Sequence, residues 1–286
     1  MENEIDVVID HRPKNQYFRE IFYHHYVYKN IDKVYVTHSS NADLYLTRKP
    51  NHFAGLCNKN KANVAVSSYI ETKVLQVLGI QNTATIYNTF DSDWSTSEYI
   101  IPSELQEQNY ILAYGRIEDD VKDFSFLIAS YNASKLWEED IKLVIMGDGS
   151  DVEMLKDHAV LGSGRNGIVF LPFTKEPFGI IKNALCVSLT SKFEGFPMVL
   201  VEALSLGTPV VSLDIVSGPN EIVQHEENGL LIEKREVPLF AEALVRMCTD
   251  IKFQTSCKAN AANSVARFSS EKIGQDWHKL LQNESN

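Results

Sequence analysis

Short apolar runs alternate with segments of helical spacing along most of the chain. From residue 109 onward these runs are rich in β-branched residues and are bounded by Gly, Pro or Asp, which is typical of βα units on a parallel sheet. The pattern predicts six strands of a doubly wound sheet, at 110–114, 142–146, 168–171, 186–190, 209–213 and 230–233. Helices are predicted near 123–136, 151–160, 177–184, 197–206, 219–225, 238–249, 253–266 and 270–282.

The first hundred residues alternate in the same way and predict a second, smaller α/β unit. Its strands are expected at 5–9, 33–37, 63–67 and 85–87, and its helices near 14–29, 40–48 and 69–77. Residues 91–108 have little periodicity and predict a linker. We therefore expect a partial N-terminal domain with its linker at 1–105 and a C-terminal domain at 106–286, whose last helix packs back on the first domain. Two facing sheets of this kind predict a ligand in the cleft between the domains.

Composition excludes several classes of protein. With 44% hydrophobic residues among 286, the chain has enough apolar side chains for globular cores. It has no apolar run of about eighteen residues and no signal-peptide pattern at its start, so a cytoplasmic protein is expected. The four cysteines are scattered and form neither a metal-binding nor a disulfide pattern. The net charge of -11 argues against a nucleic acid as the partner.

Tyrosines and histidines gather in the first third of the chain, which is close to neutral. They are Tyr17, Tyr23, His24, His25, Tyr26 and Tyr28. The pattern favours a half-buried aromatic face of a helix. The alternative that stays open is peripheral contact with a sugar acceptor or an anionic membrane surface, which would place the protein at the inner face of the cytoplasmic membrane.

One segment predicts a helix start that binds an anion. Residues 191–197 follow a predicted buried strand and open a helix with Pro197 in its first turn. Gly195 allows a ligand to approach the backbone closely. The free N–H groups near Met198 and Val199 favour phosphate oxygens.

Two carboxylates flank this helix start. Glu194 precedes the helix and would repel a phosphate, so we expect it to accept hydrogen bonds from sugar hydroxyls. Glu202 lies a little more than one turn inside the helix and is expected to hold ribose hydroxyls. Taken alone, the pattern is equally consistent with a Glu194 that only caps the helix and a solvated Glu202.

Arg116 and Lys122 form a second candidate group. Arg116 follows the predicted strand at 110–114, and Lys122 lies six residues later at a helix start. Cations that converge at the carboxyl end of a strand stabilise the charge on a departing nucleoside diphosphate. Taken alone, the segment is better explained by surface cations beside neighbouring carboxylates.

Three further features carry weaker predictions. Pro172 and Phe173 lie at the end of another predicted strand. Two roles are equally open for them: contact with a nucleobase, or a simple loop that leaves the strand. His38 lies at the carboxyl end of a strand in the first domain and could face the cleft, although a lone histidine is more often structural. The turn at 147–150 lacks the third glycine of a dinucleotide fingerprint, so no nicotinamide cofactor is predicted. Nothing in the sequence forms a metal-ligand cluster, and no metal is expected.

Taken together, these motifs resemble the retaining GT-B glycosyltransferases of glycosyltransferase family four, of the bacterial lipopolysaccharide and capsule type. The likeness spans nearly the whole chain and is strongest from about 109 to 282. Its ordered parts are Gly115-Arg116 with Lys122, residues 143–149, Ser191 to Glu202, and residues 207–211, 217–221 and 228–231. The resemblance implies an α/β, GT-B-like fold in which two Rossmann-like parallel-sheet domains face a cleft, the first one abbreviated.

The resemblance also implies roles for the candidate residues. Arg116 and Lys122 would bind the donor diphosphate, Glu194 the sugar hydroxyls and Glu202 the ribose, while His38 would face the transferred sugar. The donor-binding backbone would comprise Gly195, Phe196, Pro197, Met198 and Val199, with Pro172 and Phe173 beside the base. The implied donor is a UDP- or GDP-sugar of the hexose type, the acceptor is a glycan or a lipid-linked molecule, and neither a cofactor nor a metal is implied.

Transfer is expected to retain the anomeric configuration. A double displacement needs a carboxylate nucleophile beneath the anomeric carbon, and none is evident in the sequence. We therefore expect front-face attack, in which the donor's own β-phosphate oxygen takes the proton of the acceptor hydroxyl.

The beginning of the chain departs from the family pattern. The family's first domain begins with a strand and a Gly-rich loop, and Met1 corresponds to the middle of that domain, so roughly eighty residues are expected to be missing. An uncovered sheet edge is expected as a result. Two other functions therefore stay open: a nucleotide-sugar-binding remnant without transferase activity, and a nucleotide-sugar epimerase, against which the transferase motifs argue.

Overall fold

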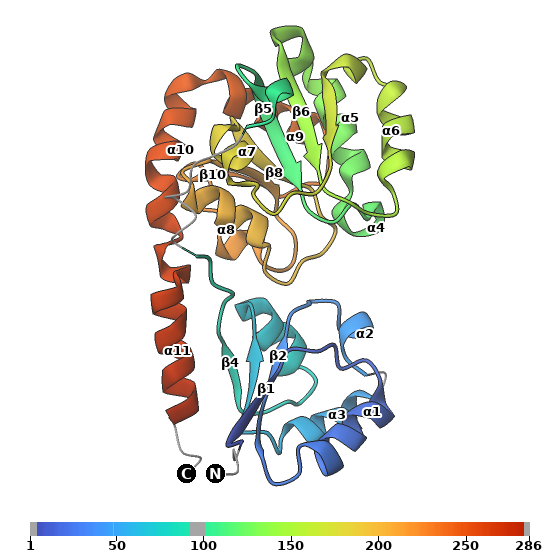
Figure 1. The fold of residues 1–286 in the computed structure, drawn as a ribbon, viewed down its shortest axis with the longest axis vertical. Coiled ribbons are helices and arrows are strands. Elements are labelled where there is room, and N and C mark those ends of the chain that lie inside the picture. The colour runs from blue at the N-terminus through green and yellow to red at the C-terminus, as the bar shows by residue number, and fades with distance from the viewer. Residues whose placement is uncertain (1–4, 48, 92–100, 283–286) are drawn as a thin grey trace.

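The computed structural model describes residues 5–47, 49–91 and 101–282 and contains two parallel sheets, each in its own α/β unit (Figure 1). We refer to residues 5–91 as the first unit and to residues 101–268 as the second. In the first unit the strands run in the order β1-β2-β3-β4, and every neighbouring pair is parallel. Their bounds are β1 Val7–Asp10, β2 Asp32–Thr37, β3 Ala62–Ala65 and β4 Thr83–Thr85.

The sheet of the second unit has six strands in the order β10-β9-β8-β5-β6-β7, and all neighbours are parallel. Their bounds are β5 Asn109–Tyr114, β6 Ile141–Met146, β7 Ile168–Leu171, β8 Cys186–Leu189, β9 Val210–Leu213 and β10 Gly229–Ile232. After β7 the chain crosses back and places β8 on the other side of β5. The strand order therefore reverses between β5 and β8, and ligands of doubly wound sheets bind at such a reversal.

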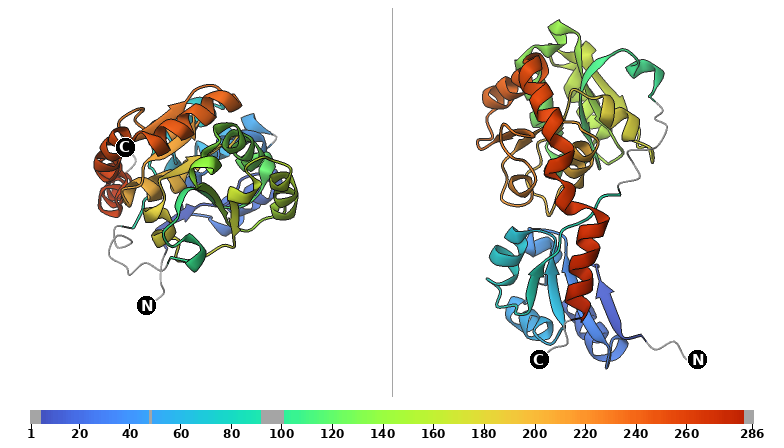
Figure 2. Two further views of the ribbon diagram at one scale, coloured as in Figure 1. Left: turned by 90° about the horizontal axis from the view of Figure 1, so that it is seen from above. Right: turned by 90° about the vertical axis from the view of Figure 1, so that its left-hand side faces the viewer.

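Helices cover both faces of the six-stranded sheet (Figure 2). α5 (Phe124–Ser134) and α9 (Val237–Thr249) pack on one face, while α8 (Met198–Ser205) and α10 (Ile251–Ser264) contact each other on the other. Because both faces are covered, β8 and β9 are buried at every position, which explains their continuous apolar runs. The remaining helices of this unit are α4 Asp119–Lys122, α6 Val152–Val160 and α7 Phe178–Asn183.

The first unit carries shorter helices. α1 (Tyr17–Phe22) continues directly into a π-helical turn, Tyr23–Val27, and α3 (Pro50–Cys57) lies next to it in Figure 1. The other helical segments are α2 Ala42–Tyr45 and a π-helical segment, Ile70–Leu75. None of the helices in the described part of the chain combines the length and the apolar composition needed to cross a membrane.

The predicted α/β architecture with two parallel sheets is confirmed, and every predicted strand is found within a few residues of its expected place. Helix α3 was not predicted, although Pro50 in its first turn and the buried side chains of Phe53 and Cys57 fit a helix start with an apolar face. The helix predicted at 219–225 is a single 3₁₀ turn at Pro219–Glu221, because the next two residues, Ile222 and Val223, enter the core. The domain bounds at 105 and 106 remain a prediction.

The two units share one apolar cluster. Tyr87 of the first unit packs against Phe196 and Phe268 of the second, and each pair of these three rings has its centroids 5.0 to 5.1 Å apart. From Phe268 the chain enters α11 (Ser270–Gln282), which runs beside the first unit in Figure 1 and in the right-hand view of Figure 2. Ile273 and Trp277 of this helix pack on the shared cluster, so the last helix of the chain ties the two units together.

Candidate functional site

The backbones of the two units come into close contact at Gly195. A Cβ atom at Gly195 would clash with the carbonyl oxygen of His38, so only glycine permits this approach. Ser40 of the first unit donates a hydrogen bond to the Glu194 carbonyl, at 2.6 Å. The contact therefore places the carboxyl end of β2, with His38, directly against the segment that precedes α8.

Two serines continue this contact. Ser67 of the first unit is hydrogen-bonded to Ser217 of the second at 2.9 Å, and the Ser217 hydroxyl also bonds to the Gly195 carbonyl at 2.9 Å. Glu221 extends the contact further, because one of its carboxylate oxygens accepts hydrogen bonds from the Ser68 backbone N–H at 2.9 Å and the Tyr87 hydroxyl at 2.8 Å. These bonds fix the relative position of the two units around Gly195.

A cavity of about 550 Å³ opens beside Gly195 and is lined from both units. It contains the four predicted catalytic residues, His38, Arg116, Lys122 and Glu194. Lys122 Nζ lies 2.6 Å from Glu194 Oε1, and the Ser191 hydroxyl donates to the same oxygen at 2.7 Å. Arg116 is different, because its side chain is 73% exposed and its Nη1 lies only loosely, at 3.5 Å, beside Glu118. The cavity thus has a closely bonded Lys–Glu pair and an arginine whose side chain is mostly exposed.

Arg235 holds the two loops that carry this pair. Its guanidinium donates to Asp123 Oδ2 at 2.5 Å, to the Thr190 carbonyl at 2.9 Å and to the Ser191 carbonyl at 2.6 Å. Asp123 directly follows Lys122, and Thr190 and Ser191 lead toward Glu194. A planar guanidinium can donate to several acceptors at once, so Arg235 holds together the two loops that carry Lys122 and Glu194.

His38 does not stand alone at the rim of the cavity. His11, which follows β1, places its Nδ1 2.9 Å from His38 Nε2. The Tyr45 hydroxyl donates to the His11 carbonyl at 3.1 Å and anchors the loop that carries it. Burial, followed by His11 and Lys14, lowers the pKa of His38 from 6.5 to about 4, so His38 is a neutral imidazole at pH 7.

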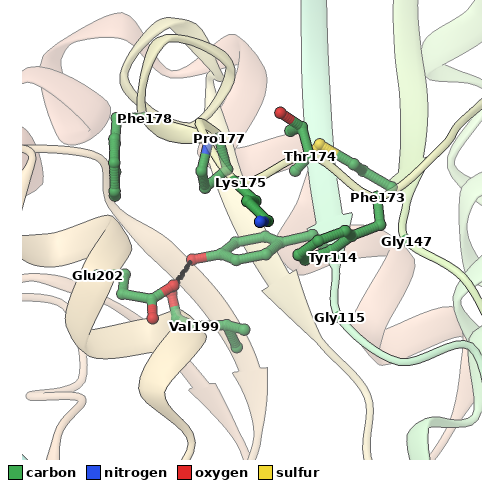
Figure 3. Close-up of a pocket in the computed structure, with 11 residues that line it drawn as sticks. Tyr114, Gly115, Gly147, Phe173, Thr174, Lys175, Pro177, Phe178, Val199 and Glu202 are labelled. Atoms are coloured by element: carbon green, nitrogen blue, oxygen red, sulfur yellow. Dashed lines mark hydrogen bonds between the residues drawn. The ribbon is translucent and has the colours of Figure 1, made fainter.

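A second cavity, of about 440 Å³, lies at the strand reversal between β5 and β8 and is mainly apolar (Figure 3). Its floor is made by the exits of β5 and β6, where Gly147 has φ of +150° and a Cβ would clash with the Gly115 carbonyl. Figure 3 shows Tyr114 reaching toward Glu202, with Phe173 and Lys175 beside the tyrosine ring.

Glu202 provides the acidic group of this cavity. The Tyr114 hydroxyl donates to its Oε2 at 2.6 Å. Burial raises the pKa of Glu202, and the hydrogen bond from Tyr114 partly opposes that rise. A half-buried carboxylate with one oxygen already bonded is suited to accept hydrogen bonds from a ligand's hydroxyls.

The other predicted site residues lie around these two cavities. Phe173 and Val199 line the apolar cavity. Pro172 is exposed beside Phe173, and Met198 is half-buried at the start of α8. The Phe196 ring is buried among Tyr87 and Phe268, so only its backbone can face a ligand. Pro197 is buried and has extended backbone angles at the N-cap of α8, which it does not cap with a side chain.

Sequence reasoning missed several residues of the site. They are His11, Tyr114, Lys175, Phe178 and Arg235. Four of them follow or end a predicted strand, as His38 and Arg116 do, so the rule that ligands bind beyond strand ends applied to them equally. Within the described residues, no three His, Cys, Asp or Glu side chains are grouped so that they could hold a metal ion.

Comparisons with known proteins show the family to which the chain belongs. Residues 97–264 match the family model described as Glycosyl transferases group 1. A lipopolysaccharide 1,6-galactosyltransferase of Escherichia coli (strain K12) is 31% identical over 191 residues, which cover 64% of this chain and 51% of that protein. The N-acetylgalactosamine-N,N'-diacetylbacillosaminyl-diphospho-undecaprenol 4-alpha-N-acetylgalactosaminyltransferase of Campylobacter jejuni is 29% identical over 200 residues, or 68% of this chain and 52% of that protein. The chain spans about half the length of both relatives.

Solved structures share the fold. The Anabaena protein HepE in complex with UDP and glucose has a TM-score of 0.81 at 21% identity, covering 98% of this chain and 78% of that chain. The lipopolysaccharide outer core galactosyltransferase WaaB has a TM-score of 0.70 at 21% identity, covering 98% of this chain and 76% of that chain. The GT-B-like arrangement predicted from the sequence is therefore confirmed.

The histidine pair gives a pH-dependent prediction. Because the pKa of His38 in the folded chain lies below 6.5, protonation favours the unfolded state, so stability is full above about pH 6.5 and falls as the pH drops toward 4. In an NMR titration of the histidine rings, we expect the His38 signal to move near pH 4 in the native chain. His11→Asn removes one of the groups that lower the pKa of His38, so it should raise the titration midpoint of His38 toward 6.5. The control is His278→Gln, an exposed residue of α11, which should leave the His38 midpoint unchanged. A native His38 midpoint at its ordinary value would contradict this account.

Proposed function

Because the chain belongs to the group 1 family of glycosyl transferases, we propose that it transfers a sugar from a nucleoside diphosphate sugar to a glycan or lipid-linked acceptor. The observation that carries this proposal is a pair of cavities that are lined by the consecutive residues Gly115 and Arg116. One is apolar and holds the half-buried carboxylate of Glu202, and the other is polar and holds the Lys122–Glu194 pair beside His38. Together they match the two ends of a nucleotide sugar.

The apolar cavity would take the nucleoside. A nucleobase would stack against Phe173 and the aromatic side chains near it. Oε1 of Glu202, the oxygen that Tyr114 does not contact, would accept hydrogen bonds from the ribose hydroxyls. Tyr114 would hold the carboxylate in position. The HepE structure, which shares the fold, was solved with UDP, and we propose a UDP- or GDP-linked donor for this chain.

The diphosphate would span the gap between the cavities. The N–H groups at the start of α8, near Met198 and Val199, would donate to its oxygens, and the helix dipole favours the negative charge there. Arg116 would swing from its exposed position to the phosphate, and Lys122 Nζ would reach it while it stays bonded to Glu194. These cations would stabilise the nucleoside diphosphate as it departs.

The sugar would lie in the polar cavity. Glu194 Oε1 is engaged by Lys122 and Ser191, so Oε2 would accept hydrogen bonds from the sugar hydroxyls. His38 would face the same sugar from the first unit, as a neutral imidazole held by His11. The sugar would therefore be gripped from both units.

We further propose that transfer retains the anomeric configuration and needs no metal ion. The bond from the anomeric carbon to the phosphate oxygen would break, and the acceptor oxygen would bond to the same face of that carbon. The acceptor proton would pass to the departing β-phosphate oxygen. Arg116 and Lys122 would supply the positive charge that balances the leaving group.

The acceptor is proposed from the relatives. One is named for transfer onto lipopolysaccharide and another for transfer onto a diphospho-undecaprenol carrier, so a glycan or a lipid-linked glycan is the class we propose here. The cytoplasmic location predicted from the sequence stays a prediction.

Donor binding tests the proposal. Isothermal titration with UDP and GDP should show saturable binding of at least one of them. Glu202→Ala should weaken that binding by about ten- to hundredfold, because it removes a charged acceptor from the ribose hydroxyls. Glu153→Ala is the matched control, since Glu153 is an exposed carboxylate on α6 whose only described ion pair is with Lys156. Absence of binding by either nucleotide, or equal binding by the Glu202 variant, would refute the donor site.

The stereochemistry can be read from the product. With a panel of UDP- and GDP-hexoses together with glycan and lipid-linked acceptors, ¹H NMR recorded during turnover should show the transferred sugar first in the anomeric configuration of its donor. EDTA should leave the rate unchanged, because the cationic side chains replace a metal. Initial appearance of the opposite anomer would contradict retention, and loss of rate that Mg²⁺ restores would contradict metal independence.

The same assay separates the two alternative functions. Donor binding without any turnover would favour a nucleotide-sugar-binding remnant, and an isomerised donor would favour a nucleotide-sugar epimerase.

A further inference from the structure

The two histidines at the rim of the polar cavity share one hydrogen bond. His11 follows β1 and His38 follows β2, which are neighbouring parallel strands. His11 Nδ1 lies 2.9 Å from His38 Nε2, and the ring centroids are 5.1 Å apart. Burial, followed by Lys14, lowers the pKa of His11, and burial also lowers that of His38, so both rings are neutral at pH 7. In such a pair one ring donates an N–H group and the other accepts it.

The loop that carries His11 is held on both sides of that residue. Arg12 donates to the Asp10 carboxylate, from Nε to Oδ1 at 3.0 Å and from Nη2 to Oδ2 at 2.5 Å. Lys14 is buried, and its ammonium donates to the Asp10 carboxylate at 3.2 Å, to the Asp10 carbonyl at 3.1 Å and to the Arg12 carbonyl. A buried charge that is bonded in this way is costly to disturb, so the position of the His11 backbone is fixed.

Two side chains from other elements contact His11. The Tyr45 hydroxyl, at the end of α2, lies 3.1 Å from the His11 carbonyl and 3.3 Å from the Val36 carbonyl of β2. It therefore connects the His11 loop to the strand that leads to His38. The Trp277 ring of α11 lies beside the His11 ring, with centroids 6.4 Å apart. The last helix of the chain thus takes part in holding the histidine pair.

Two arrangements of the protons would satisfy the bond between the rings. If His11 donates from Nδ1, His38 accepts at Nε2 and must carry its own proton on Nδ1. If His38 donates from Nε2, His11 accepts at Nδ1 and carries its proton on Nε2. A neutral histidine ring is intrinsically more stable with its proton on Nε2, so the second arrangement places both rings in the preferred tautomer and the first places neither. Among the described residues, no other hydrogen bond of either ring offsets this preference.

We propose that His11 is a positioning residue that holds His38 as the Nε2–H tautomer, so that His38 offers the lone pair of Nδ1 to the transferred sugar. His38 lines the polar cavity, and its Nε2 is engaged by His11, so Nδ1 is the ring nitrogen left for a ligand. His38 would then accept a hydrogen bond from a sugar hydroxyl, whereas the opposite tautomer would donate one. This assignment of the contact rests on the proposed donor site.

The position of the proton can be measured on the folded chain without any substrate. Long-range ¹H–¹⁵N correlation spectra of the histidine rings near pH 7 should show His38 with a protonated Nε2 and an unprotonated Nδ1. The proton on Nε2 should give a signal in the native chain and lose it in His11→Leu, because the hydrogen bond slows its exchange with water. A His38 ring protonated on Nδ1, or an Nε2 proton signal that His11→Leu leaves unchanged, would overturn the inference.

Kinetics test the effect of His11 on transfer. With a UDP- or GDP-hexose that the native chain turns over, His11→Leu should lower kcat by about tenfold or more, because His38 loses the bond that orients it. The affinity for UDP or GDP alone should be unchanged, since the apolar cavity is lined by the second unit. His11→Asn should recover much of the rate, because its Oδ1 can accept from His38 Nε2. The matched control is His158→Leu, an exposed histidine of α6, which should keep the native rate.

The outcomes separate this inference from the proposed function. A native kcat in His11→Leu, or a rate of His11→Asn no higher than that of His11→Leu, would contradict the positioning role. Failure of the native chain to bind either nucleotide would refute the donor site, and the NMR spectra would still decide whether His11 holds the Nε2–H tautomer of His38.

Discussion

The contact between Gly195 and the His38 carbonyl is the constraint on which the rest of the site depends. It allows β2 of one unit and the segment before α8 of the other to touch through their backbones, which any side chain at residue 195 would prevent. Ser40, Ser67 and Ser217 bond around it, and the polar cavity beside it is lined from both units. A site of this kind exists only in the assembled pair of units, whereas the apolar cavity with Glu202 belongs to the second unit alone.

The central strands β3, β8 and β9 could be predicted well because they are buried at every position. Runs such as the one in β9 have no polar alternation, and turn residues separate them, so the βα pattern is legible in the sequence. Short elements were less predictable, since their pattern covers too few residues. Helix α3 was missed, and the segment after Gly218 forms one 3₁₀ turn in place of the predicted helix.

The binding roles of Arg116, Lys122 and Glu194 remain predictions. That these three residues lie around one cavity was predictable, because each of them follows a predicted strand. The pairing of Lys122 with Glu194, the contact of His11 with His38 and the loop contacts of Arg235 were not, because each joins residues distant in sequence. Phe196 belongs to the segment that was predicted to bind the donor, but its ring packs in the aromatic cluster between the units. The aromatic helix face was expected to be half-buried. Tyr17, Tyr23 and Tyr28 are half-buried, whereas Tyr26 is 73% exposed.

The central claim is that close backbone contact at Gly195 makes one site from two units. Small-angle X-ray scattering of Gly195→Ala tests it most directly, with Gly274→Ala as the control, because a Cβ at Gly274 meets no atom within 4 Å. We predict a larger radius of gyration for Gly195→Ala than for the native chain, since the added methyl group forces the units apart, and an unchanged radius for Gly274→Ala. A scattering curve of Gly195→Ala that superimposes on the native one would contradict the claim.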